Sequence, residues 1–266
     1  MLYVVATPIG HLKDITYRAV EVLKDVDLIL AEDTRTSGVL MRAYGIETKM
    51  ESFHKFNEKG KEEDIVRLLE GGQKVALISD AGTPGICDPG ADLIRRCRVA
   101  GVKVEVVPGP CAFVAALSLY GSAERFQFVG FIEKKGKKQL IDALYYPGIT
   151  IAYESPHHLM KMLTWMDEIA PEKKIFIARE LTKIHEETLE GTAKELLDHF
   201  EGKKILGEYV LIIEGNENPF DLTPQELMDS LQKRFDISPR EALIAAAKLL
   251  NVPKQSLYSQ VHKCNS

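Results

Sequence analysis

From residue 79 to residue 90 the chain reads Ser79-Asp80-Ala81-Gly82-Thr83-Pro84-Gly85-Ile86-Cys87-Asp88-Pro89-Gly90. An apolar run at 75–78 precedes this stretch, and a run with helical spacing at 91–99 follows it. Its three glycines and two prolines favour backbone conformations that other residues rarely adopt. Such a loop, placed at the end of a strand, can bring bare backbone against a ligand. The alternative is a long surface turn, and the local sequence does not choose between the two.

Outward from this stretch, apolar runs alternate with helical patterns through the first half of the chain. The expected strands are 2–6, 28–31, 75–78 and 104–107. This alternation predicts a largely parallel sheet with helices on both faces. The loops that follow the strands are 7–10, 32–35, 80–90 and 108–110. In a parallel sheet these loops lie on one rim, where they can converge on a ligand. The polar and aromatic segment 52–58 is expected to form a loop.

The second half predicts another α/β domain with more antiparallel character. Its expected strands are 126–132, 149–153, 175–178 and 209–213. Beyond a linker at 216–223, the segments 224–234 and 239–250 have helical patterns and predict a small helical extension. We therefore expect an α/β domain at 1–120, a second α/β domain at 121–217 and a helical extension at 218–266.

Length and composition narrow the class of protein. The chain has 266 residues, 45% of them hydrophobic, and a formal net charge of −5. This length suits one large or two medium domains. The negative charge argues against general affinity for nucleic acid but leaves room for a local basic patch. Four cysteines without metal-type spacing predict reduced thiols in a cytoplasmic protein. The sequence shows neither a secretory leader nor an apolar run long enough for a membrane span.

Several enzyme classes are disfavoured because their motifs are missing. The sequence has no Walker loop, no GxGxxG, no Gly-x-Ser-x-Gly elbow and no HExxH. No cluster of metal ligands is visible, so no metal is expected. His157 and His158 open a predicted helix, and adjacent histidines cannot both face one metal site. A surface or capping position is therefore favoured for this pair.

Two charged segments leave alternatives open. The segment 179–187 follows an apolar strand and is either a solvated turn or a site that binds an anionic substrate and moves a proton. A second segment holds Lys134, Lys135, Lys137 and Lys138 around Gly136. It is either an exposed loop or a set of point charges that follows a phosphate backbone.

Six ordered motifs resemble those of the tetrapyrrole methylase superfamily. They lie at 5–10, 31–35, 79–90, 107–110, 153–156 and 178–183. Within the superfamily the chain resembles the branch of ribosomal RNA small-subunit methyltransferases. The resemblance covers residues 2 to about 215, and the helical extension is also similar to that branch.

The resemblance implies two α/β domains with the cofactor, S-adenosyl-L-methionine, in the cleft between them, in a homodimer. It implies 2′-O-methylation of a cytidine ribose in the decoding region of 16S ribosomal RNA in the small ribosomal subunit. The residues implied to contact the cofactor are Pro8, Asp80, Ala81, Gly82, Thr83, Gly85, Cys111, Ala112, Tyr153, Glu154 and Leu181. The chain departs from the pattern of the branch at His11, Cys111 and His185.

A ribose 2′-hydroxyl is a weak acid, so we expect a base or a positive charge to assist its deprotonation. Glu180 and His185 are the candidate bases. Arg179 and Lys183 are candidates for orienting phosphate or stabilising negative charge. Asp33 and Arg35, on a neighbouring rim loop, are candidates for holding the nucleotide. Glu180 can equally well do no more than pair with Arg179.

Two other classes of function stay open at this point. One is a methyltransferase of the same superfamily that acts on a tetrapyrrole. The first loop, Thr7-Pro8-Ile9-Gly10, speaks against it, because the resemblance implies a glycine-rich loop there in the small-molecule branch. The other is a non-catalytic module that binds the cofactor or RNA. Neither a membrane nor a metal is expected for any of these functions.

Overall fold

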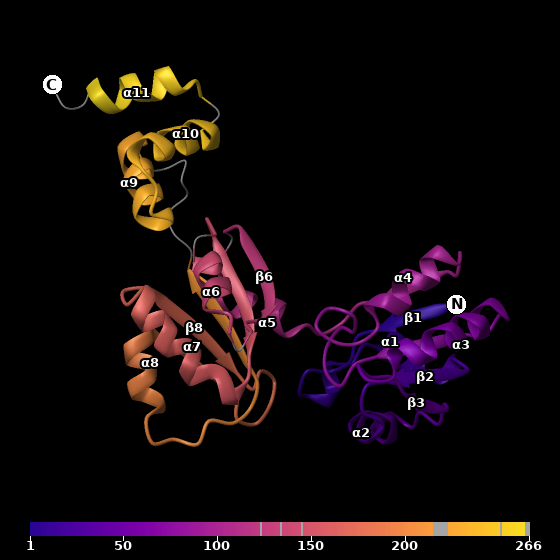
Figure 1. The fold of residues 1–266 in the computed structure, drawn as a ribbon. Coiled ribbons are helices and arrows are strands. Elements are labelled where there is room, and N and C mark those ends of the chain that lie inside the picture. Colours follow the sequence, from indigo (N-terminus) through magenta and orange to yellow (C-terminus); the bar gives the residue numbers. More distant parts are fainter. Residues whose placement is uncertain (123, 134, 145, 215–222, 251, 264–266) are drawn as a thin grey trace.

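The computed structural model describes residues 1–122, 124–133, 135–144, 146–214, 223–250 and 252–263 of the chain. Two α/β domains lie side by side, and three further helices follow them in the chain (Figure 1). Each domain is built on one five-stranded sheet, and the two sheets differ in topology. None of the described helices is long and apolar enough to cross a membrane.

The first domain holds a wholly parallel sheet of strand order β3-β2-β4-β1-β5. Its strands are β1 (Leu2–Val5), β2 (Leu28–Ala31), β3 (Met50–Ser52), β4 (Val75–Ile78) and β5 (Val104–Val107). The parallel sheet predicted from the sequence is confirmed. Strand β3 was not predicted, because its three residues are only partly buried at the edge of the sheet and include the polar pair Glu51 and Ser52.

Helices cover both faces of this sheet, as the alternation predicted. They are α1 (Tyr17–Asp25), α2 (Thr34–Tyr44), α3 (Glu58–Glu70) and α4 (Ala91–Val99). Leu23 of α1 and Leu40 of α2 share one hydrophobic cluster, and Leu69 of α3 and Leu93 of α4 share the cluster on the opposite face. The central strands β2 and β4 are apolar throughout because side chains on both of their faces are buried.

The second domain holds a mixed sheet of strand order β6-β7-β10-β8-β9. Its strands are β6 (Phe126–Phe131), β7 (Ile149–Glu154), β8 (Lys174–Arg179), β9 (Glu187–Thr192) and β10 (Tyr209–Glu214). Only the pairing of β6 with β7 is parallel, so the predicted antiparallel character is confirmed. Helices α6 (Lys137–Leu144), α7 (Pro156–Ile169) and α8 (Ala193–Phe200) cover one face.

Helix α5 (Ala112–Tyr120) covers the other face of the second sheet, although it follows β5 of the first domain in the chain. Ala116 of α5 and Ile9 from the loop after β1 pack with Ile151, Val210 and Ile212 of that sheet. Two segments that begin at the rim of the first sheet therefore complete the core of the second domain. This packing fixes where the rim loops of the first domain meet the second.

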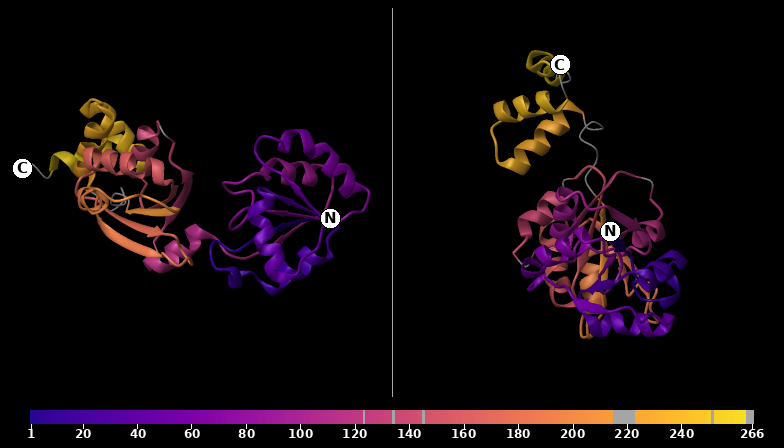
Figure 2. Two further views of the ribbon diagram at one scale, coloured as in Figure 1. Left: turned by 90° about the horizontal axis from the view of Figure 1, so that it is seen from below. Right: turned by 90° about the vertical axis from the view of Figure 1, so that its right-hand side faces the viewer.

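The last three helices form a hydrophobic cluster of their own. They are α9 (Pro224–Phe235), α10 (Pro239–Leu249) and α11 (Lys254–Lys263). Thr223 and Ser238 begin α9 and α10 with capping boxes, in which the hydroxyl and a glutamate three residues later satisfy each other's backbone N–H groups. The predicted helical extension is thus present, and Figure 2 shows its helices in two further views.

The lysine segment differs from the predicted exposed loop. Lys134 lies outside the described residues, and α6 already begins at Lys137. Lys137 and Lys138 therefore occupy the first turn of a helix, with exposed side chains, and Lys137 donates to Glu168 at 2.5 Å. The helix forms because Leu140, Ala143 and Leu144 place an apolar face on the second core.

Candidate functional site

The loops that follow β1, β4 and β5 are joined at the rim of the first sheet. Thr7 and Gly82 exchange two backbone hydrogen bonds, of 2.8 and 3.1 Å between N and O. The Thr83 hydroxyl donates to the carbonyl oxygen of Pro110 at 3.2 Å. Gly82 has φ +81°, a conformation that favours glycine. The convergence of the rim loops predicted from the sequence is therefore present.

A cleft of about 420 Å³ lies between these loops and the second sheet. This volume lies within the usual range for small-molecule sites. Most of the residues predicted to contact a cofactor line it, namely Asp80, Ala81, Gly82, Thr83, Cys111, Ala112, Tyr153, Glu154 and Leu181. Pro8 and Gly85 do not line the cleft. Pro8 is buried, and its neighbour Ile9 lines the cleft instead.

Several residues that line the cleft were not singled out from the sequence. They are Glu32, Ile86, Cys87, Asp88, Phe131, Ser155, Pro156, Ala178, Gly207, Glu208, Tyr209 and Val210, besides Ile9. A signal was available for some of them, since Glu32 precedes Asp33 on a rim loop and Asp88 lies within the stretch 79–90. The turn at Gly207 and Glu208 carries no comparable signal, because a polar turn before an apolar strand is common.

Three carboxylates give the first-domain wall of the cleft a negative character. Burial raises the pKa of Glu32, and the charges of Asp88 and Asp80 raise it further. Burial is also the main cause of the raised pKa of Asp80 and of Asp88. Carboxylates that crowd together in a partly buried cleft favour a cationic ligand, because its charge relieves their repulsion.

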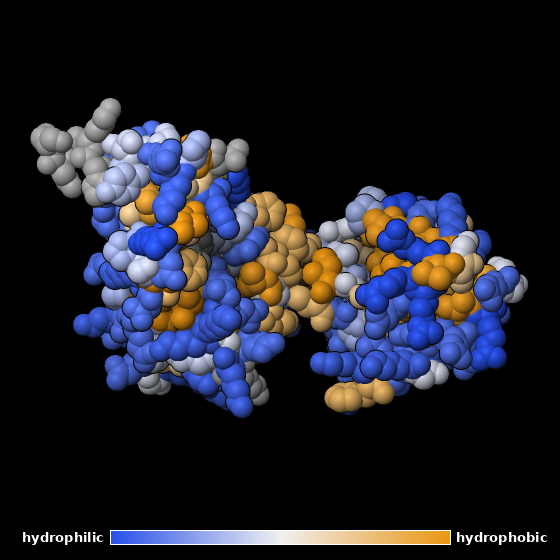
Figure 3. All heavy atoms as spheres, turned by 45° about the horizontal axis from the view of Figure 1, so that its top comes forward, coloured by the Kyte–Doolittle hydropathy of each residue, from blue (hydrophilic) through white to orange (hydrophobic). Residues whose placement is uncertain are grey.

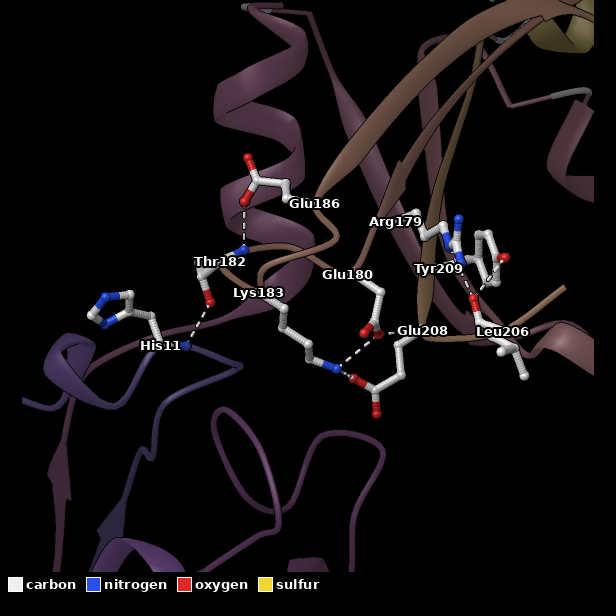
Figure 4. A network of polar contacts seen from close by, with 9 residues as sticks. All are labelled: His11, Arg179, Glu180, Thr182, Lys183, Glu186, Leu206, Glu208 and Tyr209. Atoms are coloured by element: carbon white, nitrogen blue, oxygen red, sulfur yellow. Dashed lines mark hydrogen bonds and ion pairs between the residues drawn. The ribbon is translucent and has the colours of Figure 1, made fainter. Parts of the chain in front are cut away.

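On the opposite wall, Lys183 lies between two glutamates (Figure 4). Its Nζ is 2.9 Å from Oε1 of Glu180 and 2.8 Å from Oε2 of Glu208. Burial lowers the pKa of Lys183, but the hydrogen bonds to Glu180 and Glu208 outweigh burial and raise it. Burial raises the pKa of Glu180, but the hydrogen bonds from Lys183 and from the backbone of Glu208 lower it overall. Lys183 is thus held as a cation at the cleft.

Of the four charged candidates only Lys183 lines the cleft, and Glu180, Arg179 and His185 do not. Arg179 donates from Nε to the carbonyl oxygen of Leu206 at 2.9 Å and from Nη1 to Glu187 at 3.1 Å. Glu180 therefore pairs with Lys183, and the pairing with Arg179 considered from the sequence is wrong. His185 is exposed on the segment between β8 and β9.

The loop that carries Lys183 interlocks with the first loop of the first domain. Glu180 and Thr182 have φ of 51° and 65°, which is uncommon for residues with a side chain. The Thr182 hydroxyl accepts the backbone N–H of His11 at 3.0 Å (Figure 4). A Cβ at Gly10 would lie 2.5 Å from Cγ of Lys183, so only glycine fits this contact. The two domains are thereby fixed to each other beside the cleft.

The predicted surface or capping position of His157 and His158 is wrong for His158. Its side chain is buried, and Nδ1 lies 2.8 Å from Oε2 of Glu154. The other oxygen of Glu154 accepts the backbone N–H of Ser155 at 2.7 Å. Position 158 faces the core because α7 already begins at Pro156, which places His158 on its buried side.

The predicted nucleotide-binding pair lies next to the cleft. Asp33 donates its backbone N–H to Oδ1 of Asp80 at 3.0 Å. A hydrogen bond from the Arg35 side chain lowers the pKa of Asp33 to about 2. The Arg35 side chain is 90% exposed, so it can meet a large ligand at the rim. Among the described residues, no three His, Cys, Asp or Glu side chains are grouped so as to hold a metal ion.

Comparisons with known proteins agree with this architecture. The family model described as Tetrapyrrole (Corrin/Porphyrin) Methylases matches residues 1–197. The chain is 42% identical to a protein of Thermotoga maritima over 81% of this chain and 99% of that protein. It is 40% identical to a protein of Escherichia coli O157:H7 over 97% of this chain and 93% of that protein. Both relatives are named "Ribosomal RNA small subunit methyltransferase I".

Solved structures share the fold at low sequence identity. A uroporphyrin-III-C-methyltransferase from Thermus thermophilus has a TM-score of 0.60 and 22% identity, over 80% of this chain and 93% of that one. A cobalt precorrin-4 methyltransferase has a TM-score of 0.62 and 15% identity, over 80% and 94%. The cofactor of the family is S-adenosylmethionine. The two sheets, the cleft between them and these matches together show that the chain belongs to the tetrapyrrole methylase family, in its ribosomal RNA small subunit methyltransferase I branch.

Proposed function

We propose that the protein transfers a methyl group from S-adenosylmethionine to a ribose 2′-hydroxyl of ribosomal RNA, at a cytidine in the decoding region of the 16S molecule. Relatives about 40% identical over nearly the whole chain carry the name of small-subunit ribosomal RNA methyltransferases. The observation that carries the proposal is one cleft in which three carboxylates of the first domain face Lys183 of the second, whose ammonium is held between Glu180 and Glu208.

The residues of the cleft fit the cofactor. S-adenosylmethionine supplies an activated methyl group on a positively charged sulfur. Glu32, Asp80 and Asp88 offer negative charge to this sulfonium and to the cofactor's ammonium group. Apolar side chains such as Leu181 and Val210 exclude water from the same space. The first-domain wall is therefore proposed to hold the cation, and the second-domain wall is proposed to contact the cofactor at Leu181 and the substrate at Lys183.

The proposed role of Lys183 is to stabilise negative charge on the ribose oxygen as its proton leaves. Its ammonium lies in the cleft wall and is kept charged by Glu180 and Glu208. Glu180 is a positioning residue, because its lowered pKa keeps it ionised beside Lys183. Glu208 also lines the cleft, and its side chain is 72% exposed, so we assign it as the proton acceptor. Arg179 holds the turn before Glu208 through the Leu206 carbonyl.

RNA is proposed to reach the cleft over surfaces on both domains. On the first domain, Arg35 is exposed beside the cleft, and Asp33 holds its guanidinium with 2.6 Å between Nη2 and Oδ2. On the second domain, Lys135 and Lys138 are exposed at the start of α6. Together with Lys137 they are candidates for phosphate contacts. A role on the ribosomal subunit would place the protein in the cytoplasm.

A homodimer is proposed from an exposed apolar surface at the junction of the domains. Its exposed residues are Val106, Val114, Leu119, Phe126 and Phe131, from β5, α5 and β6. Strand β5 is an edge of the first sheet, and strand β6 is an edge of the second. Figure 3 shows hydrophobic side chains gathered where the two domains meet. A second copy of the chain would cover this surface and end the exposure of both edges.

The test is transfer of a radiolabelled methyl group to small ribosomal subunits from a strain that lacks this modification. Tetrapyrrole acceptors are assayed in parallel. A 2′-O-methyl group blocks alkaline cleavage of the adjacent phosphodiester, so a single protected cytidine supports the proposal. Label on a base, or label only on the tetrapyrrole, contradicts it. Cofactor binding without any transfer would support a non-catalytic module.

A further inference from the structure

The loop between β3 and α3 presents an aromatic ring to solvent. Phe56 is 95% exposed, and Lys55 and Lys59 beside it are exposed as well. Within the described part of the chain, neither lysine takes part in a salt bridge, whereas Lys61 pairs with Glu51. An exposed aromatic ring between two unpaired cations is the side-chain combination that binds single-stranded nucleic acid.

This loop is held in place by its own hydrogen bonds. The amide oxygen of Asn57 accepts the backbone N–H of His54 at 2.8 Å, and its amide nitrogen donates to the carbonyl oxygen of Ser52 at 3.2 Å. Phe53 is buried in the core at the base of the loop. The His54 ring lies edge-on to the Phe56 ring, with 6.1 Å between centroids. Phe56 therefore projects from an ordered loop and does not fold back onto the domain.

The loop belongs to the same rim as the cleft. Strand β3 runs parallel to β2, so the segment after Ser52 leaves the sheet on the side of Glu32 and Arg35. Glu58 also accepts the backbone N–H of Gly90 at 3.3 Å, and Gly90 ends the stretch that forms the cleft. Figure 1 shows β3 beside β2, near α2, at the edge of the first domain. The aromatic ring thus lies along the rim, outward from the cleft.

The carboxylates and cations of the rim determine where the phosphates of a bound nucleic acid can lie. The carboxylates of Glu32, Asp80 and Asp88 repel phosphate from the floor of the cleft. On the β2 and β3 side of this rim, exposed cations lie farther out, at Arg35, Lys55 and Lys59. On this domain, a strand whose target ribose enters the cleft therefore meets favourable charge where its flanking phosphates run outward along the rim.

We propose that the segment 54–59 is a docking site for the substrate RNA, in which Phe56 stacks on an unpaired base that flanks the target nucleotide. Lys55 and Lys59 contact the phosphates on either side of that base. This inference rests on the proposed function and adds the direction in which the strand leaves the cleft. Stacking on an aromatic ring suits unpaired bases, whose faces are open, and is tolerant of base identity.

The first experiment measures steady-state methyl transfer to small ribosomal subunits, together with S-adenosylmethionine affinity by calorimetry. Phe56→Ala is expected to raise KM for the subunit roughly 5- to 100-fold and to leave kcat and cofactor affinity unchanged. Phe56→Trp is expected to restore KM because it keeps the stacking face. Val99→Ala is the matched control, since Val99 is 86% exposed at the end of α4, on the opposite rim.

The second experiment measures binding to a single-stranded RNA oligonucleotide as salt is varied. Removing two phosphate contacts with Lys55→Ala and Lys59→Ala is expected to reduce the slope of log K against log salt by about 1.4. Lys24→Ala, an exposed lysine at the end of α1, is expected to leave the slope unchanged.

The outcomes separate this inference from the function on which it rests. An active wild-type protein with the same KM as Phe56→Ala overturns the docking site and leaves the methyltransferase intact. If Phe56→Leu restores KM as well as Phe56→Trp does, the ring meets an apolar protein surface and RNA stacking is wrong. A wild-type protein that binds the cofactor but methylates no ribosomal RNA contradicts the proposed function itself.

Discussion

At the scale of single residues, the two walls of the cleft differ in their charged groups, since the lining holds a lysine, Lys183, only on the second domain. The first domain contributes three carboxylates whose pKa values are raised mainly by burial. The second contributes Lys183, whose pKa is raised by its two glutamate partners despite burial. A sulfonium ion is suited to the first wall and a developing oxyanion to the second. The proposed methyl transfer to an alcohol can thus use the carboxylates of the first domain and the ammonium of Lys183 on the second.

Lys183→Ala is expected to lower the rate of methyl transfer about 10²- to 10³-fold, because the charge that we propose to stabilise the ribose oxygen is lost. Cofactor affinity is expected to hold or to rise, since a cation is removed beside a cationic ligand. Single-turnover rates and calorimetry measure the two effects separately. Lys183→Arg keeps the charge and is expected to retain part of the rate. A rate close to wild type in Lys183→Ala would remove this role.

Cofactor affinity is expected to fall as the pH is lowered from neutrality, because protonation neutralises the carboxylates, and their raised pKa values make this occur at a higher pH than for free carboxyl groups. The stability of the protein without cofactor is expected to change with pH in the opposite direction. Groups with raised pKa values in the folded state contribute stability at low pH, and that contribution is lost as the pH rises through those values. Calorimetry at a series of pH values is the measurement. Asp80→Asn should weaken the pH dependence of binding, whereas Glu21→Gln, an exposed change on α1, should not.

At the scale of elements, strand-end loops carry the site and hold it together. The loop after β1 pairs with the loop after β4 through Thr7 and Gly82. It also meets the second domain, where Thr182 accepts the backbone N–H of His11. Because this loop is held by contacts on both sides, it couples the position of one domain to the position of the other. The positive φ angles of Glu180 and Thr182 carry a local cost in conformational free energy. The contacts around the loop offset this cost.

Gly10→Ala tests this interlock. The added Cβ would lie 2.7 Å from the Thr182 hydroxyl oxygen and 2.9 Å from the backbone oxygen of Leu181, so the two loops must separate. A shift of about 1 Å near Lys183 is expected to lower the transfer rate about 10²-fold. Gly60→Ala is the matched control, because a Cβ at this helical position has nothing within 4 Å. It is expected to keep full activity and to stabilise the protein by about 0.5–1 kcal/mol. Equal activity in both variants would contradict the interlock.

The elements that could be predicted from the sequence are those whose burial leaves a periodic signal. The run Leu28–Ala31 is apolar because both faces of β2 are covered, and the parallel sheet followed from such runs. Strand β9 (Glu187–Thr192) was not predicted, because an edge strand with one solvated face is rich in polar residues. The position of Glu208 at the cleft was equally hidden. It depends on the contact between the turn before β10 and the loop after β8, which no local pattern records.

At the scale of the whole molecule, the two domains are joined by shared packing as well as by the chain. Helix α5 begins at the rim of the first sheet and covers one face of the second. This arrangement leaves its outer side apolar, together with the edge strands β5 and β6. Phe131 belongs both to this exposed surface and to the lining of the cleft. Association of two copies through the surface would therefore close one side of each cleft.

Val114→Asp is expected to convert a dimer into a monomer, because it would bury an unpaired charge on α5, where Val114 is 49% exposed in the single chain. Sedimentation at micromolar protein concentration measures the mass, and wild type should sediment at twice the mass of the chain. Val99→Asp, at an exposed position away from this surface, is expected to stay dimeric. Because Phe131 would lose its cover, the monomer is also expected to bind the cofactor more weakly. A wild-type protein that sediments as one chain, or a Val114→Asp variant that sediments as two, would show that this surface is covered by something other than a second copy.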